Sequence, residues 1–167
     1  ARETGYGPEL LTSVEQVNNR QKKIVSEKIK AYFEPFGGVK DRVLALWGLA
    51  FKANTDDIRD SAALVTIAEL TSMGMRVRAY DPAAGSNAAR ALNGNPLAEI
   101  SDDQYGILKG ADALAVVTDW NQFRNPDFKT IGSALASPVI FDGRNLYPKK
   151  LLSDLGFTSF SIGRPRT

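Results

Sequence analysis

The sequence predicts an α/β fold in which a doubly wound, mainly parallel sheet is preceded by one long amphipathic helix. From Pro8 to about Phe33, apolar residues recur at steps of three, four and seven, which is the spacing of one helix face. Beyond Lys40, short apolar runs alternate with amphipathic segments, which is typical of parallel strands joined by crossover helices. The runs are apolar enough to be covered on both faces, so we expect helices on both sides of the sheet.

The long helix exceeds what a small α/β domain can cover. About 25 residues at 1.5 Å each make a rod of about 38 Å, which cannot bury its whole apolar stripe on such a domain. We therefore expect part of the stripe to contact another domain or subunit. The helix should end within Glu34–Gly38, because proline cannot continue a helix and paired glycines favour a turn. The chain thus divides into a helical part at 1–36 and an α/β domain at 37–167.

The α/β part is expected to alternate strands with helices. In such sheets, ligands collect beyond the carboxyl ends of the strands, near the point where the strand order reverses. The turns that follow the strands are therefore the places to search for a site. The expected strands are Val43–Leu49, Arg76–Tyr80, Ala113–Thr118, Val139–Asp142 and Thr158–Ile162. The expected helices are Ala62–Met73, Ser86–Leu92, Asp102–Gly110, a broken one over Trp120–Leu135, and Pro148–Leu155.

Composition limits the kinds of ligand and site. Lys and Arg total 21 against 19 for Asp and Glu, a surplus too small to indicate a nucleic-acid or membrane partner. An anionic ligand therefore needs a local cluster of cations. Cysteine and histidine are both absent, which excludes thiol nucleophiles, disulfides, imidazole bases and the metal sites that those residues build.

Neither a metal site nor a membrane span is expected. Asp56, Asp57 and Asp60 match no calcium-loop spacing and are explained more simply as partners of the neighbouring arginine. No apolar run approaches the roughly 18 residues that cross a bilayer, and no charged and apolar leader opens the chain. We therefore expect a cytoplasmic protein. Because the chain starts at Ala1 rather than Met, it is also expected to be a piece of a longer protein.

The turn after the first expected strand, Gly48–Ser61, has the densest set of charged side chains. Phe51 and Lys52 follow the strand, and Arg59 stands just before a helix. Cationic side chains beside a helix amino terminus suit a phosphate, because side-chain and backbone donors point the same way. Alternatively, Lys52 and Arg59 only pair with the neighbouring aspartates on a solvated loop.

An acid ends the second expected strand, where a dinucleotide-binding fold holds the ribose. Asp81 has this position and precedes Pro82. However, the turn after the first strand contains Gly48 alone, without the spaced glycines that let a backbone touch a pyrophosphate, and the chain has no Walker motif. We therefore interpret Asp81 as a turn residue stiffened by Pro82, in a Rossmann-like domain without a phosphate loop.

Two later strand ends also have unusual residues. Arg144 follows a glycine in Phe141–Asn145 and suits bidentate contact with a phosphate or a sugar diol. Alternatively, Arg144 pairs with Asp142 at the surface. In Thr118–Trp120, the tryptophan is interpreted as core packing rather than as a stacking platform.

Taken in order along the chain, these motifs resemble the UDP-glucose/GDP-mannose dehydrogenase family. The resemblance implies an oxidoreductase that converts UDP-glucose to UDP-glucuronate with two NAD. The family's catalytic cysteine would precede Ala1, so the resemblance assigns no catalytic residue here. We expect this chain to form the UDP-sugar side of the cleft and to be inactive without the amino-terminal NAD domain. The resemblance rests on Gly48–Ser61, Tyr80–Pro82, Thr118–Trp120 with Phe123, Phe141–Asn145, Val17–Asn18 and the closing Ser161–Arg164.

The resemblance also assigns roles to single residues. Phe51, Lys52 and Arg144 resemble positions that contact the UDP-sugar, and Arg59 resembles an arginine that reaches the NAD pyrophosphate. The long helix is similar to the end of the family's dimerising centre, which implies a homodimer. All of this requires that the cations leaving two strand ends converge in one crevice.

Two alternatives remain open. One is a sibling dehydrogenase acting on GDP-mannose or a UDP-N-acetylhexosamine, although Asn54–Arg59 and Phe141–Tyr147 resemble the UDP-glucose branch most. The other is a non-catalytic α/β interaction module such as a receiver-like domain. A receiver needs an acid pair after the first strand, where Lys52 and Arg59 dominate, and a phosphoacceptor after the third, where Asp119 stands.

Overall fold

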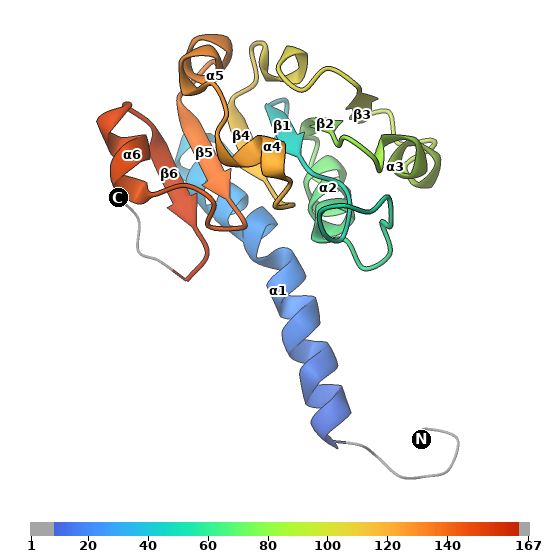
Figure 1. Cartoon of the computed structure of the whole chain (residues 1–167). Helices are drawn as coiled ribbons and strands as arrows, with labels where there is room; N and C mark the ends of the chain where they lie inside the picture. The colour runs from blue at the N-terminus through green and yellow to red at the C-terminus, as the bar shows by residue number, and fades with distance from the viewer. Residues whose placement is uncertain (1–8, 164–167) are drawn as a thin grey trace.

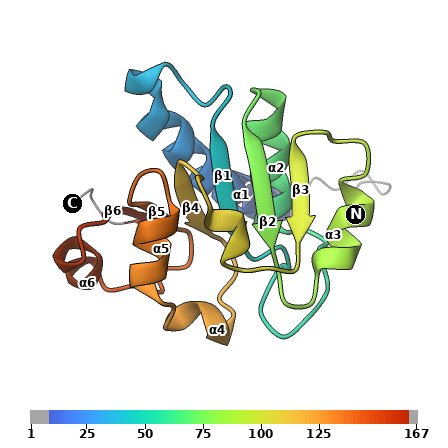
Figure 2. The same cartoon turned by 90° about the horizontal axis from the view of Figure 1, so that it is seen from above.

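One parallel sheet of six strands forms the centre of the molecule, in the order β3-β2-β1-β4-β5-β6 (Figures 1 and 2). The computed structural model describes residues 9–163 and the side chains of residues 12–163. The strand order reverses between β1 and β4, which is where ligands of such sheets bind. The strands are β1 (Val43–Trp47), β2 (Arg76–Tyr80), β3 (Ala98–Ser101), β4 (Ala113–Val116), β5 (Val139–Asp142) and β6 (Thr158–Ser161).

The central strand β1 is paired on both sides. Leu46 lies opposite Ala79 of β2 and Ala115 of β4, and all three side chains are buried. Successive side chains of a strand point to opposite faces, so Leu44 and Leu46 join one core cluster and Ala45 and Trp47 the other. The predicted doubly wound α/β architecture is therefore confirmed.

Helices cover both faces of the sheet (Figure 2). The core cluster on one face is completed by three helices and that on the other face by four short ones. The first set is α1 (Glu9–Phe33), α2 (Ala62–Ser72) and α3 (Gly85–Ala91). The second is the 3-10 turn η3 (Gly106–Leu108), α4 (Asn121–Arg124), α5 (Phe128–Ala134) and α6 (Lys149–Asp154).

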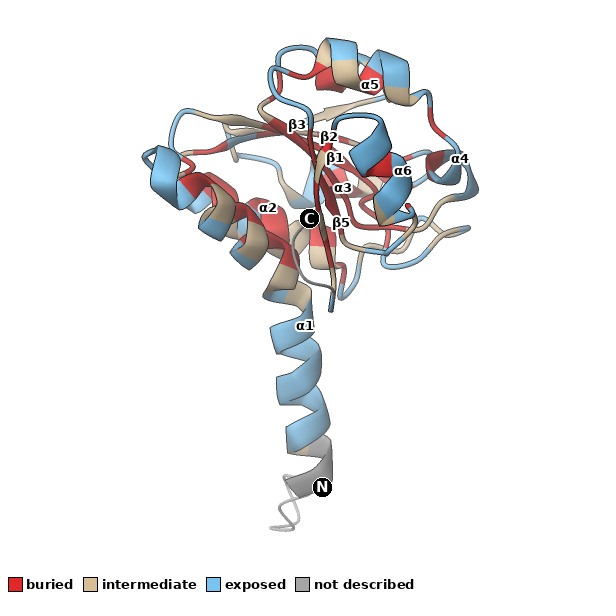
Figure 3. Cartoon of the chain, turned by 90° about the vertical axis from the view of Figure 1, so that its left-hand side faces the viewer, coloured by how far each residue is buried: buried red, intermediate tan, exposed pale blue. Residues whose placement is uncertain are grey.

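Helix α1 has two different halves (Figure 3). Its second half packs on the sheet through Val25, Ile29 and Phe33, which are at most 5% exposed. Its first half projects from the domain, and Val14 and Val17 are 48% and 52% exposed. The helix ends where expected, followed by the 3-10 turn η2 (Glu34–Phe36) and a left-handed glycine. Within residues 9–163, no helix has the length and apolarity needed to span a membrane.

Polar contacts fix α1 beside α2. Glu69 of α2 accepts a hydrogen bond from the Ser26 hydroxyl at 2.5 Å. The same carboxylate pairs with the ammonium groups of Lys23 and Lys30, each at 3.2 Å. The Ser26 hydrogen bond is the main reason that the pKa of Glu69 lies below its usual value. The start of the α/β part is therefore joined to α1 by charge as well as by packing.

Two sequence predictions were wrong. The edge strand β3 was missed because its sequence, Ala98–Ser101, is short and lacks an apolar run. The helix predicted over Asp102–Gly110 is only the η3 turn, because the Asp103 carboxylate accepts the N–H groups of Tyr105 and Gly106 and forms a local turn instead. The long helix and the other strands and helices occur as predicted, with ends that differ by up to two residues.

Candidate functional site

Gly48 brings the turn after β1 into contact with the end of β4. Its φ is 95°, and an added Cβ would lie 2.5 Å from the Thr118 Cβ. Only glycine adopts this conformation without strain and leaves room for such a close approach. The first strand therefore ends two residues earlier than predicted, at Trp47, and the loop begins at the switch point of the sheet.

The backbone of Leu49 and Ala50 is fixed from three directions. Both N–H groups donate to Oδ2 of Asp81, at 2.7 and 3.0 Å. The Leu49 carbonyl accepts the Ser61 hydroxyl, and the Ala50 carbonyl accepts the Thr118 hydroxyl, both at 2.7 Å. Because the carboxylate uses both N–H groups, Leu49 and Ala50 have none to give to a pyrophosphate. The missing phosphate loop thus has a structural cause.

Phe51 continues this fixed segment into the cleft. Its N–H donates to the Asp57 carbonyl at 2.8 Å, and its carbonyl accepts Nη2 of Arg144 at 3.0 Å. The Phe51 side chain is 48% exposed. Lys52 follows on the surface, and its charge is one of several that lower the pKa of Asp57. Phe51 and Lys52 therefore place an aromatic ring and an ammonium group at consecutive positions of the loop that follows β1.

The turn after β5 holds Arg144 opposite this segment. Asp142 is buried and accepts the N–H groups of Arg144 and Tyr147, at 3.1 and 2.9 Å. The turn packs against α1 so closely that a Cβ on Gly143 would lie 2.9 Å from Cγ2 of Val25. The alternative surface pair between Arg144 and Asp142 is therefore wrong. Asp142 holds the backbone of Arg144, and the guanidinium group reaches Phe51 instead.

These loops and α1 enclose a cleft of about 860 Å³, called the main cleft below. An ion pair of 2.7 Å between Lys22 and Asp60 joins α1 to the β1 loop at its side. One N–H group of Arg144 donates to the Phe51 carbonyl, so most of its five N–H groups stay available to a ligand. The lining residues include Asn18, Gln21 and Lys22 of α1, Phe51 and Asp60 of the β1 loop, Val117, Gly143, Arg144, Asn145 and Ile162.

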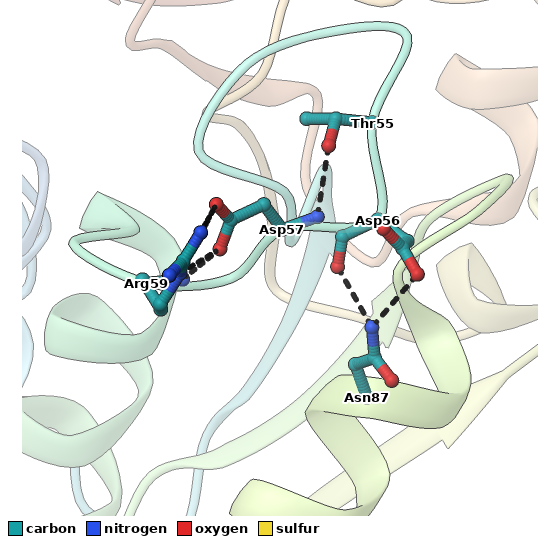
Figure 4. Close-up of polar contacts among 5 residues, drawn as sticks. All are labelled: Thr55, Asp56, Asp57, Arg59 and Asn87. Carbon is teal, nitrogen blue, oxygen red and sulfur yellow. Dashed lines mark hydrogen bonds and ion pairs between the residues drawn. The ribbon is translucent and has the colours of Figure 1, made fainter.

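Arg59 lines a neighbouring cleft of about 730 Å³. Its Nε and Nη2 donate to the two carboxylate oxygens of Asp57, at 2.9 and 2.7 Å (Figure 4). The hydrogen bond from the Arg59 side chain is the largest of the effects that lower the pKa of Asp57 to about 2. Across this cleft, Nδ2 of Asn87 donates to the carbonyl and carboxylate oxygens of Asp56. The Arg59 side chain is 87% exposed, so its guanidinium group is neutralised by Asp57 but accessible.

The structure brings only some of the expected site residues together. Phe51 and Arg144 line the main cleft and are joined by a hydrogen bond, but Arg144 alone of the expected cations lines that cleft. Lys52 is exposed next to Phe51 but does not line that cleft. Arg59 lines the neighbouring cleft, paired with Asp57 as the solvated-loop alternative described. Arg164 of the closing motif lies outside the described residues.

Sequence reasoning recognised half of the role of Asp81. Its Oδ1 accepts the N–H groups of Ala83 and Ala84, which confirms the predicted turn. Its Oδ2 holds the β1 loop and accepts the Trp120 indole N–H at 3.0 Å, which was not predicted. The sequence signal for this role is an acid in the ribose position together with a β1 turn that lacks the spaced glycines of a phosphate loop. Trp120 packs against both core clusters, which confirms its structural interpretation.

A family model for the UDP-binding domain of the UDP-glucose/GDP-mannose dehydrogenase family matches residues 45–149. The chain belongs to this family. The match runs from within β1 to the start of α6, so it includes the β1 loop and the Arg144 turn. This membership confirms the resemblance drawn from the motifs.

Curated relatives in the UDP-glucose/GDP-mannose dehydrogenase family agree with this assignment. A UDP-glucose 6-dehydrogenase of Pseudomonas aeruginosa is 43% identical over 99% of this chain and 37% of the relative. The UDP-glucose 6-dehydrogenase TuaD of Bacillus subtilis is 34% identical over 99% of the chain and 35% of the relative. The chain therefore spans little more than a third of the length of these relatives.

Solved structures of the family share the fold. A UDP-D-ManNAc dehydrogenase from Pyrococcus horikoshii superposes with a TM-score of 0.76 at 25% identity, over 95% of this chain and 34% of that one. A UDP-glucose dehydrogenase from Pyrobaculum islandicum gives 0.71 at 28% identity, over 89% and 31%. The Rossmann-like sheet preceded by a long helix is thus an architecture that the family contains.

Proposed function

We propose that the chain is the UDP-sugar-binding part of an NAD-dependent UDP-glucose 6-dehydrogenase, which as a whole converts UDP-glucose to UDP-glucuronate with two NAD. The observation that carries the proposal is the hydrogen bond from Arg144 to the Phe51 carbonyl, which joins two loops at the rim of one cleft. The relatives named UDP-glucose 6-dehydrogenase support the choice of sugar. The share of those relatives that the chain spans supports the view that other domains complete the enzyme.

In this proposal, three side chains bind the nucleotide sugar. Arg144 donates its remaining N–H groups to a phosphate or to a sugar diol, in the bidentate geometry that guanidinium groups favour. Lys52, which is exposed next to Phe51, adds a positive charge near the main cleft, and the exposed ring of Phe51 packs against the ligand. Lys22 is already neutralised by Asp60, so Arg144 and Lys52 are the cations that we assign to the diphosphate.

The cofactor is assigned to another domain of the whole protein. The β1 turn does not suit a dinucleotide, because Asp81 uses the N–H groups of Leu49 and Ala50. When bound, NAD accepts the hydride that leaves the sugar. We propose that Arg59 reaches its pyrophosphate, for which the guanidinium group must share or leave Asp57. The chain has no cysteine, so we assign it no catalytic residue and propose that it is inactive alone.

A titration tests this function. Addition of UDP-glucose to the ¹⁵N-labelled chain should perturb amide signals around Phe51 and Arg144 with weak affinity, because much of the cleft belongs to the rest of the enzyme. Mixing the chain with UDP-glucose and NAD should yield no NADH. Absence of any perturbation, or steady production of NADH, would contradict the proposal.

The second candidate is a sibling enzyme with another nucleotide sugar. The likeness to a UDP-D-ManNAc dehydrogenase structure favours a UDP-N-acetylhexosamine among these siblings. Parallel titrations with UDP, UDP-glucose, UDP-N-acetylmannosamine and GDP-mannose separate the candidates. Tighter binding of UDP-glucose than of UDP supports the first, whereas tighter binding of another sugar nucleotide replaces it.

The receiver-like alternative predicts a different response. Asp119, its expected phosphoacceptor, pairs with Arg124 at 3.5 Å near the start of α4. Phosphorylation of Asp119 by acetyl phosphate, without any response to a nucleotide sugar, would favour a non-catalytic module.

A further inference from the structure

Asp81 stands where two loops meet behind the main cleft. The residue follows β2 and is only 6% exposed. Its Oδ1 accepts the N–H groups of Ala83 and Ala84, at 2.9 and 2.8 Å, and thereby closes its own turn. An acid at this strand end would bind a ribose in a dinucleotide-binding domain. Here the carboxylate is buried and turned towards the protein, so it serves another purpose.

The second oxygen of the same carboxylate holds two other segments. Oδ2 accepts the N–H groups of Leu49 and Ala50, at 2.7 and 3.0 Å, and the indole N–H of Trp120 at 3.0 Å. Leu49 and Ala50 directly precede Phe51, whose carbonyl accepts the Arg144 guanidinium group. A shift of the two bonded residues is therefore passed to the ring of Phe51 and to its bond with Arg144.

We propose that Asp81 is a positioning residue for nucleotide-sugar binding, which holds the β1 loop so that Phe51 and Arg144 meet at the cleft. The inference rests on the proposed function of the main cleft, because it says which residue fixes the positions of Phe51 and Arg144 relative to each other at that cleft. Asp81 itself lies outside the residues that line the cleft. Its effect on a ligand is therefore indirect and passes through the backbone of Leu49 and Ala50.

The ionised carboxylate is essential to this role. All five groups that face its two oxygens are N–H donors, and only an ionised Asp accepts at both oxygens. An Asn of the same shape has one oxygen and one NH₂ group. Whichever way that amide turns, an NH₂ group opposes at least two N–H donors, so either the β1 loop or the β2 turn is released.

The experiment compares Asp81→Asn with Asp112→Asn in the 167-residue chain. Asp112 is a matched control, because its carboxylate also accepts a backbone N–H, that of Val43, and a side-chain donor, that of Arg42. It lies at the amino ends of β1 and β4, at the opposite edge of the sheet from the main cleft. Each variant is titrated with UDP-glucose, and amide hydrogen exchange is measured at Leu49 and Ala50.

We expect Asp81→Asn to weaken UDP-glucose binding about tenfold, the loss that one charge-assisted hydrogen bond gives. The amides of Leu49 and Ala50 should lose their protection, while that of Leu46 in β1 stays protected. Asp112→Asn should lower the melting temperature and leave the affinity within about twofold of the parent chain, since its bonds do not reach the cleft.

Failure of this inference can be told from failure of the proposed function. If the parent chain does not respond to UDP-glucose, the proposed function falls. If the parent chain binds, and Asp81→Asn binds equally well with Leu49 and Ala50 unprotected, Asp81 is not a positioning residue. If Asp81→Asn does not fold, Trp120→Phe decides, because it keeps an aromatic ring beside the core and removes the indole donor from Oδ2. A loss of about threefold then supports the inference, and an unchanged affinity overturns it.

Discussion

Arg144 is the residue whose loss should affect the ligand most directly. Arg144→Ala removes the N–H donors that remain available at the main cleft, together with the hydrogen bond to the Phe51 carbonyl. We expect UDP-sugar affinity to fall by about 1 to 3 kcal/mol, the range for charge-assisted contacts, and Lys52→Ala to act in the same direction. Isothermal titration of the complete enzyme with UDP-glucose measures the loss.

Arg124→Ala is the matched control for Arg144→Ala. Arg124 is also an exposed arginine near a strand end, but it pairs with Asp119 in an exposed ion pair of 3.5 Å and does not line the main cleft. Its removal should leave affinity almost unchanged. Equal losses in the two variants would mean that the effect reflects net charge rather than a contact at the cleft.

The position of Arg144 could be predicted from sequence, but its partner could not. A glycine and an arginine directly after an apolar run identify a projecting cation at a strand end. The group that accepts its hydrogen bond is the backbone carbonyl of Phe51, and every residue has such a carbonyl. Side-chain identity therefore drew attention to Asp142, the nearest acid in the chain. Asp81 was understood only in part for the same reason, since most of its donors are backbone N–H groups.

At the scale of elements, the junction of β1 with its loop should tolerate no side chain at Gly48. Gly48→Ala combines a positive φ of 95° with a Cβ that would lie 2.5 Å from the Thr118 Cβ. We expect the free energy of unfolding to fall by at least about 3 kcal/mol, from backbone strain plus overpacking. Urea denaturation of the chain measures the change.

Gly94→Ala separates the two causes. Gly94 has nearly the same φ, 89°, but an added Cβ there meets no atom within 4 Å. Its substitution should cost about 1 to 2 kcal/mol, from backbone strain alone. If both variants lost the same free energy of unfolding, the close approach of the β1 loop to the end of β4 would add nothing to the cost of Gly48→Ala.

Elements with a strong apolar pattern were predictable, and those held by local polar contacts were not. β1, β4 and β5 are buried almost throughout, and such runs stand out in the sequence. The edge strand β3 has partly buried and exposed residues, so its identity depends on pairing with β2 rather than on its own composition. The segment 102–110 resembles a helix in apolar spacing, but the side chain of Asp103 stops it at one turn.

At the scale of the whole molecule, the two halves of α1 differ in burial. The predicted surplus of its apolar stripe is seen in Val14 and Val17, which are exposed on the projecting half, while Val25, Ile29 and Phe33 complete the core. Residues 25–33, which the sequence assigns to the helical part, therefore contribute side chains to the core of the α/β part. We expect the α/β part to lose its fold without 25–33, because those residues cover one face of the sheet.

The projecting half of α1 should join two copies of the chain. We propose a homodimer that buries Val14 and Val17, because about half of each side chain is exposed without it. Val17→Asp would place a charge in that contact at a cost on the order of a few kcal/mol, so the variant should sediment as a monomer at concentrations where the parent chain is a dimer. Gln16→Asp adds the same charge about 100° around the helix and should leave the dimer intact. A parent chain that sediments as a monomer at all concentrations would show that this stripe is covered by another part of the longer enzyme instead.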